Sequence, residues 1–293
     1  MTPTDSPSAA RAGQVAGRLA AIAGLLACPA CRGNLTIGAG NLHCTRCDGR
    51  FAIQDGDALL AIRGTSETWG KPQPAEQSAN YQTEYQRVEK VATYNLHYRQ
   101  RLFKRFSTRR EYKLIGRQIR RIGRSHILLD PPCGGGCLTP AFSDSADLVI
   151  EADNAIGQIL FGCAESKVAT PRVWMTASAF HIPLGNNAVD GAICVRLAHH
   201  LPTAAERERL LQELLRVSRR FVIFTYFDHY SLKYLTHRLR HPFGSRPPKL
   251  TMTTARVAEL VRAQGARLVA APPLSRISSG HRYALIVKEG VRP

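Results

Sequence analysis

Three consecutive glycines separate two short apolar runs within residues 125–153 (SHILLDPPCGGGCLTPAFSDSADLVIEAD), and this arrangement constrains the fold more than any other feature of the chain. The runs at residues 127–129 and 148–150 contain only aliphatic side chains, which is typical of parallel strands buried on both faces. Glycine has no Cβ, so a glycine turn can bend sharply and bring its backbone close to a ligand. We therefore expect an α/β unit: a strand, the glycine turn, a short helix over residues 138–142 and a second strand.

Acidic residues stand at the end of the second expected strand. Asp153 comes three residues after Ile150, and a carboxylate at this place can accept two hydrogen bonds from the hydroxyl pair of a ribose. The full glycine fingerprint of dinucleotide-binding folds is absent, which argues against NAD. The pattern thus indicates a ribose-containing ligand bound at the glycine turn.

The segment DPPCGGG, residues 130–136, resembles the D-x-G-x-G-x-G loop of class I S-adenosylmethionine-dependent methyltransferases, with Pro132 in place of the first glycine. Residues 174–190 and 196–201 resemble later segments of that family, in the family's order. The resemblance covers roughly residues 90–290. It implies an α/β fold with a Rossmann-like, seven-stranded sheet, helices on both faces, and S-adenosylmethionine as cofactor. The further elements expected are strands at 188–195 and 221–227, helices at 204–217 and 253–264, and a terminal hairpin at 267–271 and 283–288.

The same resemblance assigns residues to the cofactor. These are Asp130, Cys133, Gly134, Gly135, Gly136, Asp153, Ser178, Ala179 and Phe180. Ser178 stands where the family commonly has an aspartate that contacts the adenine amino group, and a serine hydroxyl can still accept a hydrogen bond. Phe180 suits either the flank of the adenine ring or a position in the hydrophobic core.

Two histidines, His199 and His200, follow the strand expected at residues 188–195, where open α/β sheets bind ligands. An imidazole titrates near neutral pH and can act as a general base if the acceptor must lose a proton. Either histidine could instead cap the following helix or pack beneath it. We treat both as candidate catalytic residues.

Two Cys-x-x-Cys pairs lie within residues 28–47, CPACRGNLTIGAGNLHCTRC. Four thiolates at this spacing, on either side of a hairpin, can surround one tetrahedral ion and leave no open position, which is typical of structural zinc. A redox dithiol or two disulfides are the alternatives. Residues 25–62 resemble the small zinc-ribbon protein that partners tRNA and protein methyltransferases, so this resemblance implies a methyltransferase downstream. The predicted zinc ligands are Cys28, Cys31, Cys44 and Cys47.

The formal net charge of +18 over 293 residues favours anionic partners. Residues 87–124, in a helical stretch expected over 79–122, contain thirteen Lys/Arg and two Glu. Five more cations and no acid lie at residues 233–249, in an insert (229–251) placed where this fold often builds a substrate lid. Both segments are candidates to line an anionic acceptor site or to contact RNA or an acidic membrane, although a solvated face would also explain the helical run. The predicted substrate-binding residues are Arg238, Arg240 and Arg246.

The chain divides into five expected regions. They are a tail or short helix (1–24), a zinc ribbon (25–63), a linker (64–78), a basic helical segment (79–124) and the methyltransferase domain (125–290). Four scattered cysteines beside one tight cluster favour a cytoplasmic location. A lipoprotein is the alternative, because residues 25–28 resemble a cleavage box, but Arg18 interrupts the apolar segment before it.

The sequence therefore predicts an S-adenosylmethionine-dependent methyltransferase that acts on an anionic acceptor, either a small molecule or one linked to lipid. The ribbon and the basic surface leave an RNA methyltransferase as the alternative. A non-catalytic binding protein is a third reading, because Pro132 and Ser178 depart from the family pattern. The oligomeric state is left open.

Overall fold

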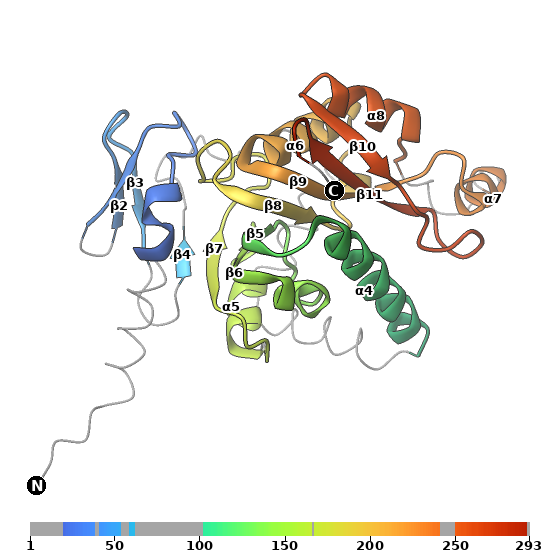
Figure 1. The fold of residues 1–293 in the computed structure, drawn as a ribbon, viewed down its shortest axis with the longest axis horizontal. Helices are drawn as coiled ribbons and strands as arrows, with labels where there is room; N and C mark the ends of the chain where they lie inside the picture. Colours follow the sequence, from blue (N-terminus) through green and yellow to red (C-terminus); the bar gives the residue numbers. More distant parts are fainter. Residues whose placement is uncertain are drawn as a thin grey trace, which may run out of the picture.

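The computed structural model describes residues 20–38, 41–53, 59–61, 102–165, 167–240 and 250–291. A large eight-stranded sheet has the order β10-β11-β9-β8-β5-β6-β7-β4, and a small three-stranded sheet has the order β1-β2-β3. The small sheet lies beside the end of the large one that β7 and β4 form (Figure 1). The expected linker and the first part of the basic segment, up to residue 101, lie outside the described residues.

The strands of the large sheet are β4 (Leu59–Ala61), β5 (Ser125–Asp130), β6 (Ala146–Asp153), β7 (Arg172–Thr176), β8 (Val189–Cys194), β9 (Ser218–Phe227), β10 (Ala266–Ala270) and β11 (His281–Lys288). Strands β4 to β9 run parallel, and β11 is antiparallel to both β9 and β10. This is the predicted class I sheet, and its seven family strands are confirmed. The eighth strand, β4, was not expected: its short apolar run pairs with the open edge of β7.

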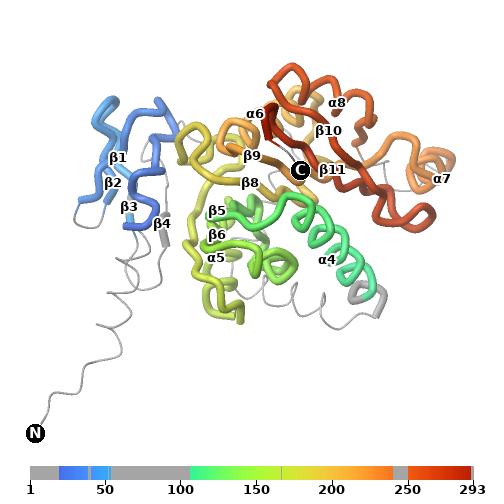
Figure 2. Tube along the Cα trace, in the orientation of Figure 1, coloured from blue at the N-terminus to red at the C-terminus, as the bar shows by residue number. Residues whose placement is uncertain are grey.

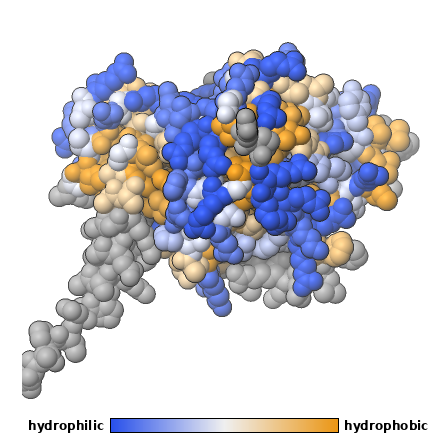
Figure 3. Space-filling model, in the orientation of Figure 1, coloured by the Kyte–Doolittle hydropathy of each residue, from blue (hydrophilic) through white to orange (hydrophobic). Residues whose placement is uncertain are grey.

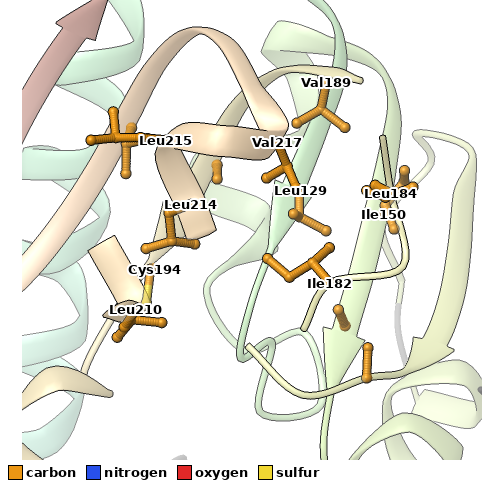
Figure 4. Close-up of a cluster of buried hydrophobic side chains, with 14 of the residues drawn as sticks. Leu129, Ile150, Ile182, Leu184, Val189, Cys194, Leu210, Leu214, Leu215 and Val217 are labelled. Carbon is orange, nitrogen blue, oxygen red and sulfur yellow. The ribbon is translucent and has the colours of Figure 1, made fainter. Parts of the chain in front are cut away.

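Helices cover both faces of the large sheet. The helices are α4 (Leu102–Ile122), α5 (Ile156–Glu165), α6 (Ala204–Val217), α7 (Leu232–Arg240) and α8 (Thr254–Arg262). Side chains alternate along β9, so that Phe221 packs on the α4 side and Val222 on the side of α6 and α8. On the second side, leucines of α6 pack with Leu129 of β5 and Ile150 of β6 (Figure 4). Both layers are therefore built on apolar strands, as the sequence predicted.

One expected helix does not form. Residues 138–142 were predicted to be helical after the glycine turn, but the chain makes two 3₁₀ turns instead, η2 (Thr139–Ala141) and η3 (Ser143–Ser145). The segment TPAFSDS contains a proline, two serines and an aspartate, which favour turns over a helix interior. Helix α4 packs close to η2: a Cβ on Gly116 would lie 3.4 Å from the carbonyl oxygen of Ala141.

The small sheet consists of β1 (Leu35–Ile37), β2 (Asn41–Cys44) and β3 (Arg50–Ala52) and follows a 3₁₀ turn, η1 (Ala23–Leu25). Its apolar side chains do not form a separate core. Ile22, Leu42 and Phe51 belong to the same buried cluster as Ile182 and Leu184, which lie in the loop before β8. The tube in Figure 2 shows the small sheet (blue) against this loop (yellow). No described helix is both long and apolar enough to cross a bilayer.

Candidate active site and metal centre

The candidate active site lies where the chain reverses direction across the sheet. From β5 the chain adds β6 and β7 on one side, and it then returns to add β8 and β9 on the other. The neighbours β5 and β8 pair in register at Leu128 with Gly191 and at Leu129 with Ala192. In open α/β sheets, ligands bind beyond the carboxyl ends of two such strands. The segments that follow β5 and β8 are the glycine loop and the histidine turn, so the topology brings these two predicted elements together.

The glycine loop is held in a conformation that only glycines adopt without strain. Gly134, Gly135 and Gly136 have φ angles of 53°, 74° and 71°. The amide of Cys133 donates to the carbonyl of Ala152 (2.9 Å), which ties the loop to β6. A Cβ built on Gly134 would meet no atom within 4 Å, so the loop leaves open space on this side. That space is what a nucleoside cofactor needs close to the backbone.

Three carboxyl groups gather at the ends of β5 and β6. Asp130 and Glu151 are paired neighbours on the two strands, and Asp153 ends β6. Burial, together with the charges of the other two acids, raises the pKa of Asp130 well above its usual range. Its Oδ2 atom is buried and has no hydrogen-bond partner within the described structure. An unsatisfied buried carboxylate oxygen beside open backbone fits a cationic ligand, and S-adenosylmethionine carries both a sulfonium and an ammonium group.

Asp153, the predicted ribose ligand, already accepts hydrogen bonds from the backbone of the protein. Its Oδ2 accepts from the amide of Gly134 (3.0 Å) and its Oδ1 from that of Ala155 (2.9 Å). The carboxylate thus holds the glycine loop and the start of α5 together. A carboxylate can accept more hydrogen bonds than these, and the contact with a ribose hydroxyl stays a prediction. Burial raises the pKa of Asp153 to about 6 despite these donors.

Two residues near the glycine loop, Glu151 and Trp174, have structural roles that the sequence analysis did not predict. Glu151 is fully buried and accepts a hydrogen bond from the hydroxyl of Thr139 at 2.7 Å. Trp174 of β7 packs so close to α5 that a Cβ on Gly162 would lie 2.5 Å from its ring. Cys133 points its side chain into the same apolar cluster as Trp174. The position of Glu151 at the end of β6, next to Asp130 at the end of β5, could have indicated its place near the loop. No feature of the sequence indicates the contact of Trp174 with α5.

The predicted adenine segment follows β7. Ser178, Ala179 and Phe180 are all partly exposed, and the Ser178 hydroxyl accepts from the amide of Phe180 at 3.3 Å. The ring of Phe180 packs at the margin of the large hydrophobic cluster, and the guanidinium of Arg209 lies 5.8 Å from its centre. Phe180 is half-buried, which is compatible with a role in either packing or adenine contact.

The two candidate catalytic histidines form the 3₁₀ turn η4 (Ala198–His200) beyond β8. His199 is buried and His200 is exposed, with ring centres 4.1 Å apart. His199 also lies 4.6 Å, ring to ring, from His281 at the start of β11. His281 was not predicted as a site residue, because 81 positions of sequence separate it from His200 and only the antiparallel pairing of β11 with β9 brings it here.

A buried ion pair fixes the strand end that carries the histidine turn. Arg196 has a left-handed φ of 63°, and its Nε donates to Glu111 of α4 at 2.9 Å. The hydroxyl of Tyr283 donates to the same carboxylate at 2.6 Å, and the amide of Arg196 donates to Thr225 at 2.6 Å. Glu111 is one of only two acids in the basic run, and it stabilises the turn rather than facing solvent.

A pocket with a cavity volume of about 170 Å³ opens beside this histidine cluster. It is lined by Phe227, Lys233, Tyr234, His237, Ser278, Ser279, Gly280 and His281. Three of these residues belong to α7, which forms within the insert expected as a lid, and four come from the segment that leads into β11. Arg238 is exposed on the same helix. Arg246 and the side chain of Arg240 lie outside the described residues.

The four predicted zinc ligands come together in the ribbon. The sulfurs of Cys28, Cys31, Cys44 and Cys47 all lie within 4.8 Å of one another. Sulfurs of Cys28 and Cys47 are 3.6 Å apart, and those of Cys31 and Cys44 are 3.5 Å apart. Four thiolates bound tetrahedrally to zinc at about 2.3 Å would be separated by about 3.8 Å, so the geometry suits this ion. All four are free thiols, not disulfides.

The two cysteine pairs have the same local structure. In each, the residue after the second cysteine has a left-handed φ, 63° for Arg32 and 60° for Asp48, and a glycine follows it. The amides of Gly33 and Arg46 each point at a cysteine sulfur, at 3.4 Å. A Cβ on Gly33 would lie 2.6 Å from the Cβ of Arg46, so the two halves approach too closely for any larger residue.

Comparison with known proteins gives a family match for two segments of the chain. Residues 129–224 match the family profile described as "Methyltransferase domain", and residues 24–56 match that described as "Trm112p-like protein". Residues 129–224 therefore form a methyltransferase domain, within a fold of the class I S-adenosylmethionine-dependent methyltransferase type. The same chain carries a Trm112p-like segment in front of that domain. A search of curated protein sequences gives no match.

Solved structures show the same fold at low identity. Magnesium protoporphyrin IX methyltransferase from Synechocystis PCC 6803, with bound SAH, is 13% identical with a TM-score of 0.60, covering 72% of this chain and 100% of that one. The N-methyltransferase NodS from Bradyrhizobium japonicum WM9, in complex with S-adenosyl-L-homocysteine, is 11% identical with a TM-score of 0.51. That alignment covers 66% of this chain and 91% of NodS.

Proposed function

We propose that this protein methylates a small or lipid-linked anionic acceptor bound in the pocket between α7 and the start of β11. One observation carries the proposal: the pocket contains His281, whose ring contacts His199, and His199 follows the strand that neighbours the glycine loop. A cofactor at the loop and an acceptor in the pocket would thus lie on adjacent strand ends.

S-adenosylmethionine supplies the reactive methyl group when bound. The residues of the chain bind the cofactor and the acceptor, orient them and exclude water. The backbone of residues 134–136 would hold the cofactor, and the free oxygen of Asp130 would accept a hydrogen bond from its cationic end. His199 would accept the proton of an acceptor hydroxyl or amine, with His200 as the exposed alternative. Phe227 and Tyr234 give the pocket apolar walls that exclude water.

The lining favours an organic acceptor with an anionic or hydroxyl group. Lys233 brings a positive charge, and Ser278 and Ser279 bring hydroxyls, between two aromatic side chains. The cavity volume of about 170 Å³ is below the ~300–1,000 Å³ of pockets that enclose a whole drug-sized ligand, so only the reacting end of an acceptor would lie inside it. We propose in addition that the four clustered cysteines hold a structural zinc ion, because they leave no position open for a substrate.

An RNA acceptor is the second candidate, and the exposed face of α4 is the observation that favours it. Six cations lie on that face at the spacing of one helical stripe: Arg109, Arg110, Lys113, Arg117, Arg120 and Arg121. Such a stripe can follow a phosphate backbone. An acceptor of this kind would reach the site from the α4 side of the sheet.

Two measurements test the proposal. Calorimetry with S-adenosylmethionine should show binding to the purified protein, and no binding would refute the enzymatic account. Transfer of a radiolabelled methyl group should then be compared on total RNA and on a lipid and small-molecule extract. Label in the extract supports the pocket as the acceptor site, whereas label in RNA alone favours the α4 face. Arg238→Glu should weaken acceptor binding and leave cofactor binding intact.

A further inference from the structure

Helix α7 has two faces of opposite character. Lys233, Tyr234 and His237 line the pocket on one side of the helix. Leu232, Leu235 and Leu239 are spaced three and four residues apart, so they form a stripe on the opposite side. These leucines are 49%, 44% and 73% exposed, respectively. The helix thus closes the pocket with its polar face and turns an apolar stripe to the outside.

The apolar surface continues beyond the helix. Tyr230, just before α7, is 72% exposed, and Ile277, in the loop that forms the opposite wall of the pocket, is 73% exposed. Figure 3 shows hydrophobic surface (orange) beside hydrophilic surface (blue) at the end of the molecule formed by α7. A soluble monomer rarely leaves several large apolar side chains together on one short helix, and such a patch marks an interaction surface.

The residues around the leucine stripe are positively charged, which favours an anionic partner. Between Asp228 and Glu259 the sequence has six Lys/Arg and no acidic residue. Arg238 lies beside the leucines on α7, and Lys233 is exposed on the same helix. A leucine face flanked by cations on a short helix is the pattern of a segment that lies in the interface of a membrane with anionic lipids. An acidic protein groove would complement the cations equally, but it would not explain the second apolar wall at Ile277.

We propose that α7 and the loop around Ile277 dock this protein on an anionic lipid surface, with the leucine stripe entering the headgroup region. The inference concerns a surface outside the catalytic groups and does not depend on the proposed methyl transfer. Docking in this orientation would bring the pocket close to the membrane, with α7 and the loop around Ile277 at the lipid surface. A lipid-linked or membrane-dissolved acceptor could then reach the pocket without crossing water.

Vesicle sedimentation of the 293-residue protein, purified with zinc present, tests the proposal without any cofactor or acceptor. We expect binding to phosphatidylcholine vesicles that contain phosphatidylglycerol, and at least tenfold weaker binding to phosphatidylcholine alone. The double variant Leu235→Ser/Leu239→Ser should reduce binding to the anionic vesicles about tenfold or more, because it removes the inserted apolar area. Leu160→Ser, at an exposed leucine on α5, is the matched control and should bind as the wild type does.

A second variant reports insertion directly. Leu239→Trp should show a blue-shifted emission and quenching by brominated lipids with anionic vesicles only. Equal vesicle binding by the wild type and the double serine variant would overturn the proposal, as would no binding by the wild type. A concentration-dependent dimer that Leu239→Ser dissociates, without vesicle binding, would assign the stripe to a second copy of the chain instead. Calorimetry with S-adenosylmethionine on the same variants separates this result from a failure of the enzyme itself.

Discussion

Nη2 of Arg32, in the first cysteine knuckle, lies 3.0 Å from both carboxylate oxygens of Glu213 on α6, a residue 181 positions further along the chain. The same carboxylate accepts two hydrogen bonds from Arg216 (2.7 and 2.9 Å) and one from the amide of Ile182 (2.7 Å). Arg32 also donates to the carbonyl of Ile182. One buried acid therefore joins the ribbon, α6 and the loop that follows the predicted adenine segment.

Glu213→Ala should destabilise the whole chain by about 3 kcal/mol, because it leaves two guanidinium groups and a buried amide without their acceptor. Urea unfolding measures this. The control is Glu208→Ala, which removes a surface pair with Arg256 and should cost less than about 1 kcal/mol. Equal effects of the two substitutions would show that the Arg32–Glu213 contact does not form in solution.

Glu213 should also contribute to the pH dependence of the free energy of unfolding at acidic pH. Burial alone would raise its pKa, but the hydrogen bonds and charges of Arg216 and the charge of Arg32 hold the pKa below the usual range. A lowered folded-state pKa contributes stability at neutral pH that is lost as pH falls through that pKa. Unfolding of Glu213→Ala should accordingly depend less on pH below the normal glutamate range than unfolding of the wild type.

Metal removal should destabilise the methyltransferase domain as well as the ribbon, because Leu42 and Phe51 share one hydrophobic cluster with Ile182 and Leu184. Cys47→Ser should lower both the bound zinc content and the Tm. The free energy of unfolding should fall by several kcal/mol, because binding a structural zinc ion contributes directly to folding. Cys137→Ser, at an exposed thiol outside the cluster, should change neither. A chelator that strips zinc and leaves the Tm unchanged would contradict the shared core.

Gly134→Ala should weaken S-adenosylmethionine binding at least tenfold, since its methyl group would enter the open space above the loop. Gly290 makes the matched control: both glycines have a positive φ, 53° and 81°, and a Cβ on either meets no atom within 4 Å. Each alanine should therefore cost about 1 kcal/mol of backbone strain. Only the change at Gly134 should alter the affinity for S-adenosylmethionine measured by calorimetry. Similar affinities for the two variants would show that the cofactor does not bind at this loop.

The cofactor-free protein should lose stability as pH rises through the range in which its buried acids ionise. Burial raises the pKa of Glu151 to about 7, which the hydrogen bond from Thr139 and the charge of Arg172 only partly offset. A raised acid pKa favours folding at low pH, and this advantage disappears between the ordinary glutamate pKa and about 7. Glu151→Gln should flatten that decline by up to about 3 kcal/mol. An unchanged pH profile of urea unfolding in this variant would disprove the assignment.

His199→Gln should reduce methyl transfer about a hundredfold or more and remove one limb of the pH–rate profile, while S-adenosylmethionine binds as before. His126→Gln is the control, because His126 is exposed and pairs with Asp147 far from the pocket. A slower enzyme with an unshifted pH profile would make His199 a packing residue. In that case the base, if one is needed, should be sought at His200 or His281.

Local pattern was sufficient for much of the fold. The aliphatic runs at β5, β6, β8 and β9 and the amphipathic pattern of α6 lie where the sequence predicted them. The helix expected at residues 138–142 was wrong, because segments this short lack enough internal hydrogen bonds to overcome poor helix formers. For the insert after β9 the sequence indicated only the positive charge. The helix α7 was not predicted, and its place beside the segment that leads into β11 comes from the tertiary structure.

The sequence by itself determined the two chemical centres, because each depends on residues close together in the chain: four cysteines within twenty positions, and three glycines between two buried strands. Tertiary structure alone decided how these centres are connected. The contacts of Arg32 with Glu213, of Glu111 with Arg196 and of His199 with His281 each join distant segments. Such pairings follow from strand order and from the packing of one layer on another, and no local spacing encodes them.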